Sequence, residues 1–130
     1  MAGENFPKLV ELMARLRGPG GCPWDREQTF DTMLPYITEE SQELVDGIRK
    51  RDFENVKEEL GDVLLHIVML SGMAEEQKLF TLDDVVKEIS DKMIRRHPHV
   101  FGDVKADSVE DVLKNWKKIK KKEKSKPTEL

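Results

Sequence analysis

Two related stretches set the architecture of this chain: EESQELVDGI at residues 39–48 and EELGDVLLHI at residues 58–67. Their carboxylates, and the apolar residues that follow, fall in the same register nineteen positions apart. At about 3.6 residues per turn, each stretch places acidic and apolar side chains on adjoining faces of a helix. The sequence therefore predicts two amphipathic helices that pack together.

Each of these helices carries an apolar stripe of the width that is typical of a core-facing helix. The first stripe comprises Leu34, Ile37, Ser41, Leu44, Val45 and Ile48. The second comprises Phe53, Val56, Leu60, Val63, Leu64, Ile67, Ser71 and Ala74. We expect both stripes to face the core of the protein.

Each helix also carries two carboxylates three residues apart at the edge of its stripe, Glu40 with Glu43 and Glu59 with Asp62. Such residues are neighbours on a helix surface, and four carboxylates near a core repel one another unless a cation neutralises them. Oxygen ligands suit Mg²⁺, which also recruits substrate phosphates, and Mn²⁺ can substitute for it. No Cys/His set has the spacing of a zinc site. The alternative is an ordinary solvated acidic face.

Helical signals dominate the remaining sequence and predict an all-α bundle of about five helices. Side chains that can cap a helix N-terminus precede each expected helix, at Asn5, at Thr29 or Thr32, and at Asp52, Thr81 and Ser108. The first helix is expected to end before Gly18, the third near Gln77 and the fourth at Arg96. We expect one domain over residues 1–122 and a flexible basic tail over residues 123–130.

The formal net charge of −4 conceals an uneven distribution. Residues 1–113 contain 14 basic and 24 acidic side chains, whereas residues 114–130 contain 8 basic and 2 acidic ones. The acidic body disfavours nucleic-acid binding, although the basic end is able to contact polyanions. No stretch is long and apolar enough to span a membrane, the N-terminus lacks the charged-then-apolar layout of a signal peptide, and the single Cys22 excludes an internal disulfide. We therefore expect a cytoplasmic protein without a membrane partner.

Candidate phosphate-binding side chains gather at the end of the fourth expected helix. Lys92, Arg95 and Arg96 stand three and four residues apart, so they can share one face. Arginine binds phosphate oxygens through two N–H groups, and lysine adds a point charge. The helix dipole also favours basic residues at this end, so a structural role is the alternative. Lys57 is a further phosphate candidate, or one half of a solvated salt bridge.

Trp116 lies near the apolar stripe of the fifth expected helix. It therefore either packs in the core or stacks on a nucleobase, because every base offers a π-face.

Together these motifs resemble the MazG family of nucleoside triphosphate pyrophosphohydrolases. The resemblance rests on GCPWD at residues 21–25, the two acidic pairs, KMIRRHPHVFGD at residues 92–103 and the Asn-Trp pair at 115–116, and it covers about residues 6–120. It implies an all-α homo-oligomer, at least a dimer. The implied reaction is Mg²⁺-dependent hydrolysis of NTPs or dNTPs between the α and β phosphates, which releases nucleoside monophosphate and pyrophosphate. Housekeeping of the nucleotide pool is the implied role.

On matching positions the resemblance implies roles for individual residues. The metal ligands would be Glu40, Glu43, Glu59 and Asp62, the phosphate contacts Lys92, Arg95 and Arg96, and the base contact Trp116. A remaining carboxylate, Glu39 or Glu58, is the candidate catalytic group that orients or deprotonates the attacking water. Lys117 stands where an acidic residue often follows the tryptophan, which leaves the base preference open.

Two other functions remain possible. A related all-α enzyme could act on a narrow substrate such as dUTP, dCTP or phosphoribosyl-ATP. A non-catalytic helical interaction module could instead bind a structural cation and use its lysine-rich end to contact nucleic acid.

Overall fold

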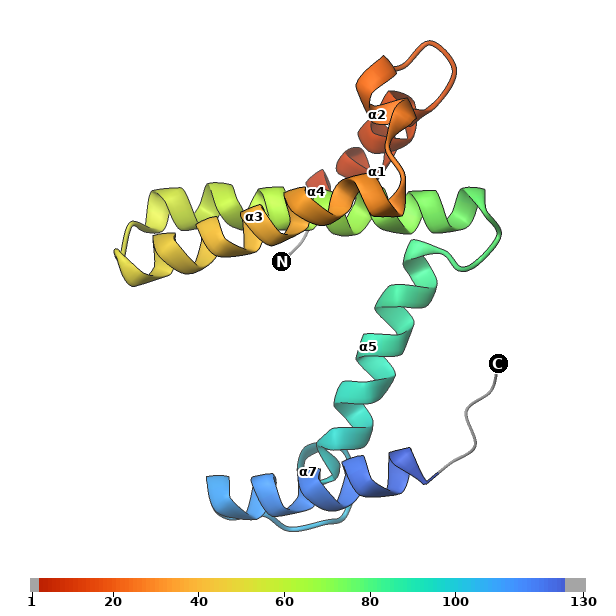
Figure 1. Ribbon diagram of the computed structural model, residues 1–130. Helices are drawn as coiled ribbons and strands as arrows, with labels where there is room; N and C mark the ends of the chain where they lie inside the picture. Colours follow the sequence, from red (N-terminus) through yellow and green to blue (C-terminus); the bar gives the residue numbers. More distant parts are fainter. Residues whose placement is uncertain (1–2, 126–130) are drawn as a thin grey trace. The chain divides into compact units, whose positions relative to one another are not determined.

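The computed structural model describes residues 3–125 (Figure 1). Every regular element in this range is a helix, which confirms the all-α class. The chain forms two compact units, Met1–Leu82 and Asp83–Leu130. The described helices are α1 (Asn5–Arg17), α2 (Pro23–Glu27), α3 (Phe30–Arg49), α4 (Phe53–Glu76), α5 (Leu82–Arg96), α6 (Pro98–Phe101) and α7 (Val109–Lys124). None of them combines the length and apolar character needed to cross a lipid bilayer.

Three expected helix starts are confirmed by their capping hydrogen bonds. The side chains of Thr29, Asp52 and Ser108 each accept a hydrogen bond from the backbone N–H three residues further on. This satisfies a donor that has no partner within its own helix. The two short helices α2 and α6 are absent from our sequence prediction. Both begin with proline, which loses no hydrogen bond at the first helical position.

The core of the first unit lies where α1, α3 and α4 meet. Its buried side chains are Met13, Met33, Val68, Met69 and Met73. Methionine is flexible enough to fill the irregular space between three helices. This core fixes α3 and α4 side by side, as Figure 1 shows.

The apolar stripes of α3 and α4 lie largely outside this core, so our expectation for them is wrong over most of their length. Only the end of the second stripe is fully buried, at Ser71 and Ala74. Gly47 of α3 approaches Asn55 and Val56 of α4, so Val56 is the member of the second stripe that lies at this contact. The exposed apolar members of the stripes are 37–64% exposed: Leu34, Val45, Ile48, Phe53, Leu60, Leu64 and Ile67. We call these seven residues the exposed stripe.

The expected single domain over residues 1–122 stays a prediction. Helix α7 continues to Lys124 and so passes the expected boundary. Of the expected flexible tail, residues 126–130 lie outside the described part of the chain.

Candidate functional site

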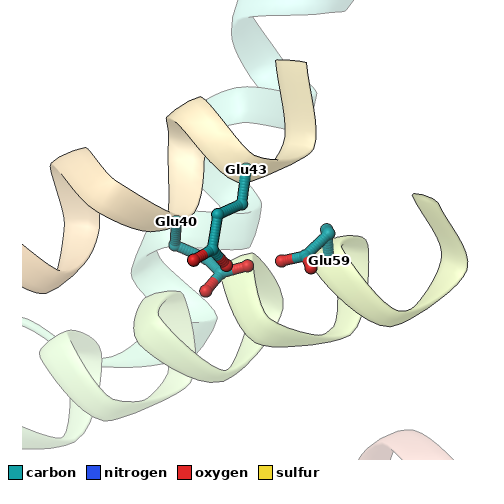
Figure 2. Close-up of side chains that lie close together, drawn as sticks. All are labelled: Glu40, Glu43 and Glu59. Atoms are coloured by element: carbon teal, nitrogen blue, oxygen red, sulfur yellow. The ribbon is translucent and has the colours of Figure 1, made fainter. Parts of the chain in front are cut away.

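Three of the predicted metal ligands converge between α3 and α4. Figure 2 shows Glu40 and Glu43 of α3 pointing toward Glu59 of α4. One carboxylate oxygen of each residue lies within 4.8 Å of the corresponding atoms of the other two. The convergence follows from the three-residue spacing on α3 and the close packing of the two helices. We call these three residues the acidic cluster.

Two oxygens of the acidic cluster are enclosed without a partner. Glu59 is only 8% exposed, and Glu40 is partly buried. Within residues 3–125, neither Glu40 Oε1 nor Glu59 Oε2 has a hydrogen-bond partner. Ionised carboxylates only accept hydrogen bonds, so the two side chains cannot satisfy each other while both are charged. Because an unpaired buried charge is costly, this donor set fits a hard cation that takes oxygen ligands.

The environment of the acidic cluster favours the protonated form. Burial, then contact with Glu59 and the negative charges of Asp62, Glu59 and Glu43, raise the pKa of Glu40 to about 8. Contact with Glu59, followed by burial, also raises the pKa of Glu43. A cation would therefore compete with a proton for this site near neutral pH.

The remaining predicted acidic residues lie around the cluster. Asp62 is partly buried, and its charge acts on Glu40, but it is not among the three residues whose oxygens converge. Glu39 and Glu58 are both exposed. The ligand role of Asp62 and the catalytic roles of Glu39 and Glu58 stay predictions.

Lys57 forms a solvent-exposed salt bridge, which is one of the two possibilities that we expected for it. Its exposed ammonium pairs with Glu54 at 2.9 Å, one turn earlier on α4.

The predicted arginines of the second unit share one carboxylate that our prediction placed in the flexible tail. Arg95 Nε lies 2.8 Å from Glu123 Oε1, and Arg96 Nη2 lies 3.1 Å from Glu123 Oε2. Hydrogen bonds from Arg95 and Arg96 lower the pKa of Glu123 to about 2. A sequence signal existed, because Glu123 follows Trp116 by seven residues and is the one acidic residue among the lysines at 114–125. Lys92, the third predicted phosphate contact, is partly buried on α5.

Trp116 packs against the end of α5. Its indole N–H donates a hydrogen bond to the main-chain oxygen of Arg96 at 2.7 Å. Its ring also meets the ring of His97 edge to face, with centroids 5.5 Å apart. The proposed stacking of Trp116 on a base stays a prediction.

Arg17 is an important structural residue that sequence reasoning missed. It donates hydrogen bonds to both carboxylate oxygens of Glu76, at 2.8 and 2.9 Å. Its Nη1 group also donates to the main-chain oxygens of Asp25 and Gln28. Arg17 therefore ties the residues that follow α1 to the end of α4. The sequence contains no signal for this role of Arg17, because two of its partners are main-chain oxygens and Glu76 is 59 residues away.

The decisive comparison is with protein families. The model of the MazG nucleotide pyrophosphohydrolase domain matches residues 28–101. The chain belongs to the MazG family. The matched range contains the whole acidic cluster together with Asp62 and the cationic residues at the end of α5.

Curated relatives of this MazG domain carry related names. It is 45% identical over 123 residues to the nucleoside triphosphate pyrophosphohydrolase of Escherichia coli strain K12, covering 94% of the chain and 47% of that protein. It is 46% identical over 125 residues to the nucleoside triphosphate pyrophosphohydrolase/pyrophosphatase MazG of Thermotoga maritima, covering 96% of the chain and 48% of that protein. The chain thus spans about half the length of these two relatives.

A solved structure supports the fold. The crystal structure of a mazG-related protein from Thermotoga maritima matches this MazG domain with a TM-score of 0.73 at 29% identity. The match covers 88% of this chain and 98% of the solved one.

Proposed function

We propose that this protein is a Mg²⁺-dependent nucleoside triphosphate pyrophosphohydrolase, which cleaves NTPs or dNTPs to nucleoside monophosphate and pyrophosphate. One observation carries the proposal: in a MazG domain, three carboxylates converge with two enclosed oxygens that lack partners. Such a site suits the cation that usually accompanies a triphosphate. The names of the curated relatives support the substrate class.

In this proposal the acidic side chains hold the metal and position water. Glu40, Glu43, Glu59 and Asp62 would bind Mg²⁺, and Mn²⁺ can replace it. The bound ion would neutralise phosphate charge and lower the pKa of a coordinated water. Glu39 or Glu58 would orient or deprotonate the attacking water.

The cationic side chains and the tryptophan would hold the substrate. Lys92, Arg95 and Arg96 would bind the phosphates, with Lys57 as a further contact, and Trp116 would contact the base. The acidic and cationic residues belong to different units, so their joint action on one triphosphate rests on the family membership.

We also propose that the protein is a homodimer or a higher homo-oligomer. The exposed stripe supports this, because its seven apolar side chains lie on the paired helices α3 and α4. Several exposed apolar side chains on two packed helices commonly mark a protein interface, and a second copy of the same helices is a self-complementary partner. A cytoplasmic role in housekeeping of the nucleotide pool is part of the same proposal.

Product analysis tests the reaction. The protein is incubated with Mg²⁺ and a panel of nucleotides that includes dUTP, dCTP and phosphoribosyl-ATP, and the products are separated by ion-exchange chromatography. We expect nucleoside monophosphate and pyrophosphate in equal amounts. Nucleoside diphosphate with inorganic phosphate would contradict the proposed bond, and complete inactivity would favour the interaction-module alternative.

Variants of the acidic residues test the site. Glu43→Gln and Asp62→Asn should abolish turnover while the circular-dichroism spectrum stays helical, because each removes a charged ligand and keeps the size of the side chain. Glu11→Gln, at an exposed position of α1, is the matched control and should retain activity. Near-normal turnover of Glu43→Gln and Asp62→Asn in saturating Mg²⁺ would refute the ligand assignment.

A further inference from the structure

The two arginines at the end of α5 already hold an anion that belongs to the protein. We propose that the carboxylate of Glu123 is an internal competitor for the phosphate-binding site formed by Arg95 and Arg96, so that a phosphate group must displace it. The inference deepens the proposed function, since it rests on the assignment of these arginines to phosphate binding. It adds a residue that tunes substrate and product affinity.

The geometry of the contact resembles that of a bound phosphate. Each oxygen of Glu123 faces a different guanidinium, at 2.8 Å from Arg95 Nε and 3.1 Å from Arg96 Nη2. Guanidinium groups bind carboxylate and phosphate oxygens through the same N–H donors. Two oxygens of one phosphate group could therefore replace the two carboxylate oxygens one for one.

Burial restrains the Arg96 side chain in addition to its contact with Glu123. Its side chain is only 18% exposed, and its main-chain oxygen accepts the indole hydrogen bond of Trp116. Within residues 3–125 its Nε atom is enclosed and has no hydrogen-bond partner. Removal of Glu123 should therefore leave this guanidinium where it is, with its charge available to another anion. Arg95, at 49% exposed, is open to solvent and to a ligand.

The charge balance points in the same direction. Among the residues that the structure describes, Glu123 is the one carboxylate paired with either arginine. It cancels one of their two positive charges, which weakens their attraction for a phosphate. When a site is free only part of the time, its apparent affinity falls by that fraction. A carboxylate that occupies the arginines about 90% of the time would weaken anion binding about tenfold.

The experiment measures the binding of inorganic pyrophosphate to the full chain by isothermal titration calorimetry. Chelator replaces Mg²⁺, so that the acidic cluster recruits no phosphate through a metal. We expect Glu123→Gln to bind pyrophosphate about five to ten times more tightly than the natural protein, because the competitor is lost. The double variant Arg95→Met/Glu123→Gln should lose this gain.

A matched control separates competition from a general change in charge. Glu110→Gln removes one negative charge from the same helix, at an exposed residue that pairs with Lys114 and not with the arginines. We expect it to change pyrophosphate affinity by less than about twofold, since exposed charges are screened by salt. Equal gains in Glu110→Gln and Glu123→Gln would overturn the proposal, as would unchanged or weaker binding by Glu123→Gln.

A second measurement uses the natural protein and does not depend on the folding of a variant. Pyrophosphate should shift the NMR signals of the Arg95 Nε–H group and of the Glu123 carboxyl carbon together, because one contact replaces the other. Perturbation of neither signal at saturation would overturn the proposal. These binding results do not depend on catalysis: missing turnover would defeat the proposed function alone, whereas normal turnover without the gain in affinity would defeat this inference alone.

Discussion

Arg17 holds both carboxylate oxygens of Glu76 through its Nε and Nη2 groups, at 2.8 and 2.9 Å. The Arg17 side chain is 12% exposed, so the contact is largely shielded on that side. The same guanidinium also donates to the main-chain oxygens of Asp25 and Gln28. One side chain therefore secures the connection between α1 and α3 against the end of α4.

Arg17→Met should lower the free energy of unfolding by about 2 kcal/mol, because it leaves several acceptors without their charged donor. Half of the Glu76 side chain is exposed, which keeps the loss below that of a fully buried pair. Urea denaturation followed by circular dichroism measures the change. Arg15→Met, at an exposed position in the same helix, is the control and should change stability by less than about 0.5 kcal/mol. Equal stability of the two variants would contradict the bracing role.

Gly21→Ala should destabilise the protein, by about 2 kcal/mol or more, because the added methyl group would overlap the main-chain oxygens of Leu16 and Arg15. The backbone at this point is fixed by hydrogen bonds from Gly21 to Gly18 and from Cys22 to Leu16. Gly72→Ala is the control, since a Cβ atom there meets nothing within 4 Å and alanine is the better helix former. In thermal denaturation, the melting temperature of Gly21→Ala should be lower than that of the natural protein, and that of Gly72→Ala should be unchanged or higher. The reverse order would show that the close approach at Gly21 is tolerated.

The metal-free protein should lose stability as the pH rises. The pKa of Glu40 is about 8, against an ordinary value of 4.5, mainly because of burial. Between these two pH values, Glu40 keeps its proton in the folded state but has lost it in the unfolded state. The contribution of Glu40 to the free energy of unfolding is therefore complete below about pH 4.5 and is lost as the pH rises through about 8. Glu40→Gln should flatten this dependence, whereas Glu11→Gln should not. Melting curves in chelator at about pH 5, 6, 7 and 8 measure it, and parallel profiles for the natural protein and Glu40→Gln would contradict the assignment.

Addition of Mg²⁺ should raise the melting temperature most at the alkaline end of the same series. Deprotonated carboxylates are the form that binds the ion, so metal affinity increases as the proton leaves. Glu43→Gln and Asp62→Asn should each reduce this shift. If Mg²⁺ raised the melting temperature equally at all pH values and in all variants, the ion would bind at a site other than the acidic cluster.

If the proposed homo-oligomer forms through the exposed stripe, Leu60→Lys should convert it to monomers. Leu60 is 52% exposed and belongs to the exposed stripe on α4, so a lysine there would bury its charge in the proposed interface. Leu12→Lys, at a residue of α1 that is 53% exposed, is matched in chemistry and exposure and should leave the assembly intact. Size-exclusion chromatography with light scattering distinguishes the states. A natural protein that is monomeric at micromolar concentration would refute the interface.

Much of the fold was predictable from local sequence. The caps at Asp52 and Ser108 lie where they are predicted, and Thr29 is the cap of the two predicted candidates Thr29 and Thr32, because a cap depends on a few consecutive residues. The carboxylate spacing likewise predicts the convergence of Glu40 and Glu43, since residues three apart share a helix face. The family motifs also draw attention to Arg95 and Arg96, which contact the same carboxylate.

Other features depend on contacts between residues that are distant in the sequence. Periodicity locates an apolar stripe on α3 and α4, but it cannot say whether the same chain covers that stripe, and most of it is exposed. The pairing of Glu123 with Arg95 spans 28 residues, and that of Arg17 with Glu76 spans 59. The amino-acid sequence therefore determines where the helices form. The packing of whole helices decides which residues Glu59, Glu123 and Arg17 contact, because rotation of a helix about its axis brings different side chains into contact.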